Sequence, residues 1–323
     1  MKKNIRLKPF VKWAGGKSQL LDFLKIIINF EYDTYFEPFL GGGSLFLDLL
    51  PQKAVLSDIN QELIISWQTL KNNDSEVLSL LSDYVTKLNH QKKEFYYNLR
   101  SQDPFLLNDV QKTARFIFLN KTCFNGLYRV NSKNQFNTPF NGKENINLSN
   151  IINESNLQKI ITFLKDSKNK ISFFYNDYKK IITKAKKNDF IFCDPPYDSD
   201  TKTFNSYHIK AFDKEHQKEL CEYLQDAHVR GAKWILTNHD TTLINFLYRD
   251  FHILKIPVDR FINSQSDNRK NNTYETIITN FKLTQEQKKK IDHLLFLKEL
   301  KNTSYCLKDY VSWKKNYRFY KKK

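Results

Sequence analysis

The sequence predicts an α/β protein with an open sheet of mainly parallel strands that a helical insert interrupts. Three observations lead to this class. Short apolar runs end at acidic residues, Asp58, Asp177 and Asp194, as expected where buried parallel strands finish at one edge of a sheet. A glycine turn joins an early strand to a helix. The alternation of strands and helices then breaks over residues 62–150.

Length and composition allow one large domain or two ordinary ones. The chain has 323 residues, 40% hydrophobic and 15% aromatic, which is enough for a sizeable core. No run approaches the ~20 apolar residues of a membrane helix, and no apolar signal core follows the basic start, so we expect a cytoplasmic protein. The four cysteines are far apart and the histidines show no ligand spacing, so no metal site is expected.

The net charge of +17 favours a polyanionic partner, because lysines and arginines that bind phosphates release counterions. The alternative is a composition merely rich in Lys, Asn and Ile. Residues 282–323 carry 13 Lys and Arg against 4 Asp and Glu. Contact with nucleic acid and a solvated basic tail both remain open for this segment.

The first motif is Lys12-Trp13-Ala14-Gly15-Gly16-Lys17-Ser18. A phosphate-binding loop would need glycine at position 11, where Val11 stands, so we exclude an ATPase. The two glycines permit a tight turn before a helix expected over residues 19–30. A lysine at a helix start is unfavourable for the helix dipole, so we expect Lys17 to face an anion such as a ligand carboxylate. An exposed basic loop is the alternative.

A strand ending at residues 35–36, the glycine turn Gly41-Gly42-Gly43 and a helix from residue 44 form a nucleotide-binding opening. A second strand, residues 54–58, ends in Asp58, which is placed to accept bonds from two ribose hydroxyls. The spacing is shorter than the ~20 residues typical of dinucleotide enzymes, so we expect a ribose-containing cofactor other than NAD. Asp58 as a helix cap is the alternative.

The insert begins with helices expected over residues 76–88, 92–99 and 109–122, the last capped by Asp109. Residues 123–140 follow and are typical of two short strands around a polar turn. This ribbon carries an aromatic ring, amides, an arginine and a lysine, the side chains that wedge between base pairs, bond base edges and contact phosphates. An ordinary surface hairpin is the alternative.

The strand and helix alternation resumes at residues 171–175 and 178–185. Asp177, between them, is placed either to accept a bond from a purine amino group or to cap the helix. A strand over residues 190–193 then leads into Asp194-Pro195-Pro196-Tyr197. The prolines fix φ and hold the carbonyls stiffly. Carboxylate, carbonyls and ring predict a pocket that accepts N–H hydrogens and stacks on a flat heterocycle; a proline turn with a solvated Asp is the alternative.

The remaining elements complete the sheet. A polar loop over residues 198–210 is long enough to close over a substrate. The other expectations are a helix capped by Asp213 up to residue 227, a strand at 233–237, a helix at 241–248, two closing strands at 251–258 and 274–281, a polar segment between them with Arg260, Arg269 and Lys270, and a helix at 285–301.

This order of motifs resembles the Dam-type DNA adenine-N6 methyltransferases that act on GATC, including DpnII-type methylases. The resemblance covers residues 9–281 and is carried by the loop at Lys12, the glycine turn, Phe124-Asn125-Gly126-Leu127-Tyr128-Arg129 and Asp194-Pro195-Pro196-Tyr197. It implies a Rossmann-like, S-adenosylmethionine-dependent methyltransferase fold whose helical target-recognition insert carries a β-hairpin. Residues 141–143 depart from the family pattern, and the tail has no counterpart.

The resemblance also implies roles for individual residues. Those matching cofactor-binding positions are Trp13, Lys17, Phe39, Gly41, Gly43, Asp58, Asp177 and Asp194. Those matching DNA-binding positions are Lys12, Phe124 (the intercalating aromatic), Asn125, Leu127, Arg129 and Pro139. The expected catalytic residues are Asp194, Pro195 and Tyr197, which would stack on an extruded adenine and accept its N6 hydrogens, without a metal.

We expect residues 1–61 and 151–281 to form the catalytic domain, 62–150 the target-recognition domain and 282–323 a basic C-terminal extension. The expected substrate is double-stranded DNA and the expected state a monomer. A cognate restriction endonuclease acting independently on the same site is left open. An RNA or protein amide methyltransferase using the same pocket, and a DNA-binding protein without catalysis, are the competing functions.

Overall fold

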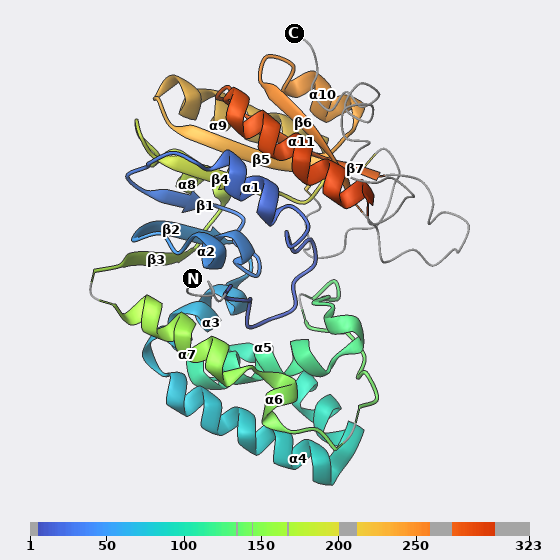
Figure 1. The fold of residues 1–323 in the computed structure, drawn as a ribbon. Coiled ribbons are helices and arrows are strands. Elements are labelled where there is room, and N and C mark those ends of the chain that lie inside the picture. Colours follow the sequence, from blue (N-terminus) through green and yellow to red (C-terminus); the bar gives the residue numbers. More distant parts are fainter. Residues whose placement is uncertain are drawn as a thin grey trace. The chain divides into compact units, whose positions relative to one another are not determined.

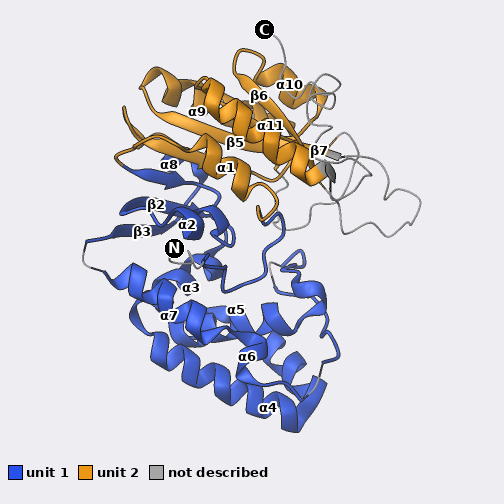
Figure 2. Cartoon of the chain, in the orientation of Figure 1, with its two compact units in different colours: residues 1–16, 34–181, 204–211 blue, residues 17–33, 182–203, 212–323 orange. Residues whose placement is uncertain are grey.

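The computed structural model describes residues 6–133, 135–143, 145–166, 168–199, 212–258 and 273–300. The chain divides into two compact units: residues 1–16, 34–181 and 204–211 form unit 1, and residues 17–33, 182–203 and 212–323 form unit 2 (Figure 2). Nearly all of the expected loop 198–210, the segment with Arg260, Arg269 and Lys270, and the tail beyond residue 300 lie outside the described residues.

Three parallel strands form the sheet of unit 1 in the order β3-β2-β1 (Figure 1). They are β1 (Tyr35–Glu37), β2 (Lys53–Asp58) and β3 (Lys170–Tyr175). Each is followed by a helix: α2 (Ser44–Leu49), α3 (Gln61–Asn72) and α8 (Tyr178–Ile182). The register pairs Asp58 with Tyr175, so the predicted acids at 58 and 177 come from the same edge of the sheet.

Helix α3 packs on this sheet, although its residues lie at the start of the expected insert. The indole of Trp67 stacks on Phe173 of β3 with ring centroids 5.3 Å apart. The amide of Gln68 donates to the Phe173 carbonyl at 2.9 Å. Asn60 caps the helix by accepting from the N–H of Leu63. This helix was not among the expected elements, because its residues were grouped with the insert; only the alternative role of Asp58 as a helix cap implied a helix here.

The other helices of unit 1 are α4 (Asp74–Ser101), α5 (Asp109–Thr122), α6 (Leu148–Ile151) and α7 (Glu154–Lys165), which gather beside one another in Figure 1. The two helices expected over 76–88 and 92–99 form α4, which has a non-helical φ of 53° at Lys92. The prediction that Asp109 caps α5 is wrong. Asn108 caps it in a reciprocal pair with Gln111: Asn108 Oδ1 accepts from the Gln111 N–H at 2.9 Å, and Gln111 Oε1 accepts from the Asn108 N–H at 3.0 Å.

Unit 2 holds four strands in the order β4-β5-β7-β6. They are β4 (Phe190–Cys193), β5 (Lys233–His239), β6 (His252–Val258) and β7 (Thr273–Thr279). β4 and β5 are parallel, and β7 is antiparallel to both β5 and β6, as expected for the closing pair. All four residues of β4 are buried, which explains why it reads as a continuous apolar run.

The helices of unit 2 are α1 (Leu21–Ile27), α9 (Lys214–Val229), α10 (Thr242–Leu247) and α11 (Gln285–Leu300). α11 lies beside α1 (Figure 1), and the Gln287 amide donates to the carbonyls of Ile26 and Ile27 at 3.0 Å. The first part of the basic extension is therefore folded against the unit. The alternation of strands and helices in both units confirms the predicted α/β class. Among the described residues, no helix is long and apolar enough to cross a membrane.

Asp213 caps α9 as predicted, and its contribution to stability is testable. Its carboxylate accepts from the N–H groups of Glu215 and His216 at 3.0 and 3.1 Å. Replacing Asp213 by Ala should lower the free energy of unfolding by about 1 kcal/mol at neutral pH. The bonds from His216 lower the pKa of Asp213. The difference should therefore be lost as the pH falls through that lowered pKa, since the folded state holds the charged form more tightly.

Denaturant titrations of both proteins between acid and neutral pH would measure this. Asp226→Ala, an exposed acid on the same helix, is the control for loss of charge alone. An equal loss of stability in the two variants would contradict the capping role.

Candidate active site

Asp194 directly follows β4 in unit 2, and both of its carboxylate oxygens hold a donor. The Lys17 ammonium lies 2.7 Å from Oδ2, and the Thr237 hydroxyl donates to Oδ1 at 2.7 Å. Lys17 is only 6% exposed, so this ion pair is weakly screened. Each carboxylate oxygen has a second lone pair. The carboxylate is therefore fixed in place and still able to accept further hydrogen bonds.

Lys17 was predicted to face an anion such as a ligand carboxylate. In the structure, Lys17 faces the carboxylate of Asp194, which belongs to the protein and not to a ligand. The ammonium also lies 4.9 Å from the centre of the Tyr197 ring. Lys17, Asp194 and Tyr197, which sequence reasoning assigned to two different roles, thus form one cluster.

Tyr197 is held by its hydroxyl and by the edge of its ring. The hydroxyl donates to Glu275 Oε2 at 3.2 Å, and the ring packs edge to face on His239 with centroids 4.7 Å apart. Burial raises the pKa of Tyr197, and the charges of Asp194 and Glu275 raise it further. The hydroxyl therefore stays protonated at neutral pH, and the ring serves as an oriented aromatic surface.

Side chains from α9 and β5 hold the main chain of this loop. Gln217 donates to the Pro196 carbonyl at 2.9 Å, and the Asp198 N–H donates to Asn238 Oδ1 at 2.8 Å. Gln217 and Asn238 bond each other and are fully buried. Within the described residues, no donor contacts the Pro195 carbonyl. That oxygen is the acceptor which the sequence assigned to a substrate amine.

Sequence reasoning missed Thr237, Gln217 and Asn238. A usable signal existed for two of them, because Thr237 and Asn238 end the strand that runs parallel to β4. The carboxyl ends of neighbouring parallel strands meet at one edge of a sheet. Gln217 lies inside a helix, where a buried glutamine has no sequence signature.

The glycine turn of unit 1 is braced by Asp58. Its Oδ2 accepts from the Gly41 N–H at 2.8 Å, and its Oδ1 accepts from the Asn60 N–H at 2.9 Å. Gly41 has φ of 50°, and a Cβ there would lie 2.7 Å from the Trp13 ring. Trp13, Gly41 and Asp58 are thus brought together. The cap of α3 is Asn60, so Asp58 is not needed for that alternative role.

Phe39 and Asp177 lie near the ends of β1 and β3 in the same unit. The Phe39 ring stacks on Tyr178 with centroids 5.2 Å apart. Asp177 is exposed, and its Oδ1 accepts from the Lys179 N–H at 3.0 Å. That bond is the local helix-start contact named as its alternative role. Gly43 has φ of 70° and packs against Trp67, which a Cβ would approach to 2.9 Å.

The expected ribbon of residues 123–140 is paired as an antiparallel hairpin. Isolated bridges join Cys123 to Phe140 and Val130 to Phe136. The Phe124 N–H donates to the Pro139 carbonyl at 2.8 Å. Continuous strands do not form, because a short 3-10 turn, η2 (Phe124–Gly126), occupies one side.

The predicted DNA-contacting side chains lie on this ribbon and on the Lys12 segment, all in unit 1. Phe124 is 53% exposed. Arg129 is exposed, and its guanidinium donates to Asn137 Oδ1 at 2.9 Å. Pro139 is exposed as well. An exposed aromatic ring and an exposed cation held by a hydrogen bond therefore both lie on the ribbon.

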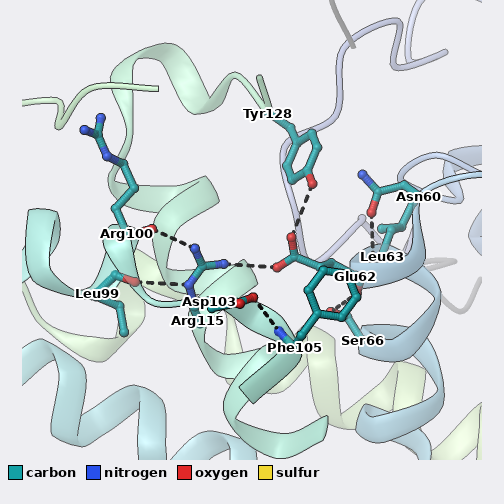
Figure 3. A network of polar contacts seen from close by, with 10 residues as sticks. All are labelled: Asn60, Glu62, Leu63, Ser66, Leu99, Arg100, Asp103, Phe105, Arg115 and Tyr128. Atoms are coloured by element: carbon teal, nitrogen blue, oxygen red, sulfur yellow. Dashed lines mark hydrogen bonds and ion pairs between the residues drawn. The ribbon is translucent and has the colours of Figure 1, made fainter. Parts of the chain in front are cut away.

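A buried polar network lies under the ribbon (Figure 3). The Tyr128 hydroxyl donates to Glu62 Oε1 at 3.4 Å, and Arg115 contacts Glu62 Oε2 at 3.2 Å. Arg115, 2% exposed, also donates to the carbonyls of Leu99 and Arg100. Burial raises the pKa of Glu62, while the charge of Arg115 opposes that shift.

This network connects the ribbon to the glycine turn. The Tyr128 ring stacks on Trp13 with centroids 5.5 Å apart, and Trp13 packs on Gly41. The ribbon and the turn are therefore held in fixed relation by one aromatic contact. Sequence reasoning quoted Tyr128 only as part of a motif and did not find Glu62 or Arg115, which have no local signal.

A Rossmann-like fold with a braced Asp-Pro-Pro-Tyr loop and a basic, aromatic ribbon defines an enzyme that binds a nucleoside cofactor and acts on a nucleic acid. The chain belongs to the family described as D12 class N6 adenine-specific DNA methyltransferase, which matches residues 13–262.

Relatives agree with this assignment. The chain is 38% identical to the type II methyltransferase M1.LlaDCHI of Lactococcus lactis subsp. cremoris, over 87% of this chain and 98% of the relative. It is 36% identical to the type II methyltransferase M.MjaIII of Methanocaldococcus jannaschii, over 86% and 100%. It is 32% identical to the DNA adenine methylase of Escherichia coli K12, over 84% and 93%.

The chain is therefore an S-adenosylmethionine-dependent, adenine-specific DNA methyltransferase. Its residues fit that cofactor. The glycine turn presents main-chain groups beside an indole and a carboxylate, which suit a ribose and a flat base. The family assignment excludes the two competing functions.

Gly41→Ala tests the glycine turn. The alanine would have to keep the left-handed backbone conformation of Gly41, and its Cβ would lie 2.7 Å from the Trp13 ring. We expect the affinity for S-adenosylmethionine to fall about tenfold or more, since displacing Trp13 adds to the strain at Gly41. Gly142→Ala is a matched control, because Gly142 has φ of 78° and no atom within 4 Å of the added Cβ. Calorimetric titration would measure both, and equal losses would contradict the role of the Trp13 contact.

Proposed function

We propose that this enzyme extrudes an adenine from double-stranded DNA, within the sequence GATC, and methylates its N6 amine by direct transfer. The observation that carries the proposal is the Asp194 carboxylate, fixed between Lys17 and Thr237 beside the Tyr197 ring. The N6 amine of a paired adenine is occupied on its Watson–Crick edge, so the base has to leave the stack, which costs a few kcal/mol.

The residues of the loop would reshape the N6 nitrogen. The Tyr197 ring stacks on the extruded adenine. Asp194 and the Pro195 carbonyl accept the two N6 hydrogens, which favours a nitrogen whose lone pair is no longer delocalised into the ring. S-adenosylmethionine supplies a methyl group on a sulfonium, which leaves as a neutral thioether. As the N–C bond would form and the C–S bond break, Asp194 would stabilise the positive charge that develops on the nitrogen, which would then release one N6 proton to water.

The cofactor contacts are proposed residue by residue. They are Trp13, Lys17, Phe39, Gly41, Gly43, Asp58, Asp177 and Asp194, as the Dam-type resemblance assigns. Asp58 accepts from the Gly41 and Asn60 N–H groups, and its carboxylate would also bind ribose hydroxyls.

DNA reading is proposed for the Lys12 segment and the ribbon, within a target-recognition domain of residues 62–150. Lys12, Leu127, Arg129 and Pro139 would contact the GATC site, as the Dam-type resemblance assigns. Phe124 would insert between base pairs, with Asn125 beside it. The exposure of Phe124 and Arg129 supports this assignment. The net charge of +17 would attract the duplex backbone.

We propose that the chain acts as a monomer, and that a separate restriction endonuclease cuts the same site in the host. Two relatives named as type II methyltransferases support the second point. Methylation-sensitive sequencing of a host that expresses the chain would give the recognised sequence. Methylation at sites other than GATC would contradict the proposed specificity and leave the family assignment intact.

Asp194→Ala should lower the rate of methyl transfer by about 10²–10³-fold or more, because the amine loses its charged acceptor. Binding of duplex DNA should change little. A tritiated-methyl assay and a duplex titration would measure the two effects. Asp250→Ala, an exposed acid of the same unit, is the control. Normal turnover by Asp194→Ala would refute the catalytic role.

Arg129→Ala should reduce discrimination between the recognised duplex and one-base variants by about tenfold or more, because a lost base contact relaxes specificity. Affinity for the cofactor should stay unchanged. Lys133→Ala, which removes another exposed charge of the ribbon, is the matched control. Ratios of kcat/KM on the two duplexes would decide, and full discrimination by Arg129→Ala would refute its role as a reader.

A further inference from the structure

Asn120 joins two segments of unit 1 that both carry proposed DNA-reading side chains. It lies in the last turn of α5 and is fully buried. Its Oδ1 accepts from the Lys12 N–H at 2.7 Å, and its Nδ2 donates to the Lys12 carbonyl at 2.8 Å. Nδ2 also donates to the Gly126 carbonyl at 3.2 Å. One side-chain amide therefore pairs with both main-chain groups of Lys12, as a neighbouring strand would.

These three bonds require asparagine at position 120. They use one acceptor and two donors, which a carboxamide supplies and a carboxylate does not. An aspartate would keep the bond from Lys12 N–H but would set its second oxygen against two carbonyl oxygens. Because the group is buried, the unmade bonds would not be replaced by water.

Gly126 completes the contact between the two segments. Its φ is 68°, and a Cβ would lie 2.3 Å from Lys12 Cδ and 2.9 Å from Lys12 Cβ. The stem of the Lys12 side chain therefore lies directly against the turn of the ribbon. A glycine is needed both for the backbone conformation and for this close approach.

The ribbon has other anchors that do not involve Asn120. The Thr138 hydroxyl donates to the Leu127 carbonyl at 2.7 Å, and the Tyr96 hydroxyl donates to the Thr138 carbonyl at 2.8 Å. Tyr128 is bonded to Glu62. The ribbon is thus held to the helices independently. What the Asn120 bonds add is the placement of Lys12 relative to that ribbon.

We propose that Asn120 is a positioning residue for sequence recognition, which holds Lys12 in register with the ribbon turn so that both segments read one DNA site. This inference rests on the proposed function, which assigns Lys12 and the ribbon to DNA. Asn120 itself need not touch DNA. Its effect should therefore appear in discrimination between sequences and depend on Lys12.

The test compares the wild type with Asn120→Asp, Lys12→Met, the double variant and the control Asn108→Ala. Asn108 caps the opposite end of α5, so its variant weakens the same helix away from Lys12. For each protein, discrimination is the ratio of kcat/KM on the recognised duplex to that on one-base variants. Cofactor affinity and melting temperature are measured alongside.

Asn120→Asp is expected to lose about tenfold or more of the discrimination, the effect of one misplaced base contact. Its cofactor affinity should stay within about threefold of the wild type, as for Asn108→Ala. In the Lys12→Met background the Asn120→Asp change should add little, because two changes acting through one contact are not additive.

Three outcomes would overturn the inference. Asn120→Asp retains full discrimination while Lys12→Met loses it, in which case the proposed function stands. Asn120→Asp loses discrimination fully even in the Lys12→Met background, which would make its role structural. Lys12→Met and Arg129→Ala both retain full discrimination, in which case the proposed DNA-reading surface fails as well.

Gly126→Ala tests the same contact if Asn120→Asp does not fold. Its Cβ would push the Lys12 stem away from the ribbon turn, so it should reproduce the loss of discrimination. Gly142→Ala, with the same backbone strain and no nearby atom, is its control. Full discrimination by a folded Gly126→Ala would overturn the inference.

Discussion

The ion pair between Lys17 and Asp194 is the constraint on which the site of this methyltransferase depends. It fixes a carboxylate at the end of a fully buried strand, with Thr237 on its other oxygen. A charged group in so buried a position is stable only when it is paired and hydrogen-bonded. The same geometry would serve the proposed chemistry, because a carboxylate that is already oriented needs no reorganisation when positive charge develops on a nearby nitrogen.

In unit 1, buried charged and aromatic side chains fix the glycine turn and the ribbon. A carboxylate braces the glycine turn, an aromatic stack connects that turn to the ribbon, and a buried guanidinium network fixes the ribbon from below. Asp58 and Arg115 bond mostly to main-chain atoms, and Glu62 bonds to the side chains of Arg115 and Tyr128. These bonds hold the loops in place without regular strands. Surfaces that read a duplex need this rigidity, since a base contact discriminates only when it is held in register.

Several of these strands and helix ends could be predicted from short stretches of the sequence. The strands at 54–58, 171–175 and 190–193 and the cap at Asp213 were expected, since apolar runs and capping residues are signals within a few positions of one another. The helix at 61–72 and the cap of α5 were not. A helix that packs on a sheet with one face and on other helices with another does not show a single hydrophobic stripe in its sequence. At the start of α5, Asn108 and the adjacent Asp109 are both residues that can cap a helix, and the sequence does not distinguish them.

The sequence by itself determined the α/β class, the glycine turn, the acid–proline–proline–tyrosine loop and a basic ribbon, because each depends on the conformational limits of neighbouring residues. Only the tertiary structure decided that Lys17 meets Asp194, that Asn120 holds Lys12, and that Glu62 and Arg115 support Tyr128. The two residues of each bonded pair are 53 to 177 positions apart in the chain. Contacts over such separations depend on how the elements pack, and that leaves no mark at either position alone.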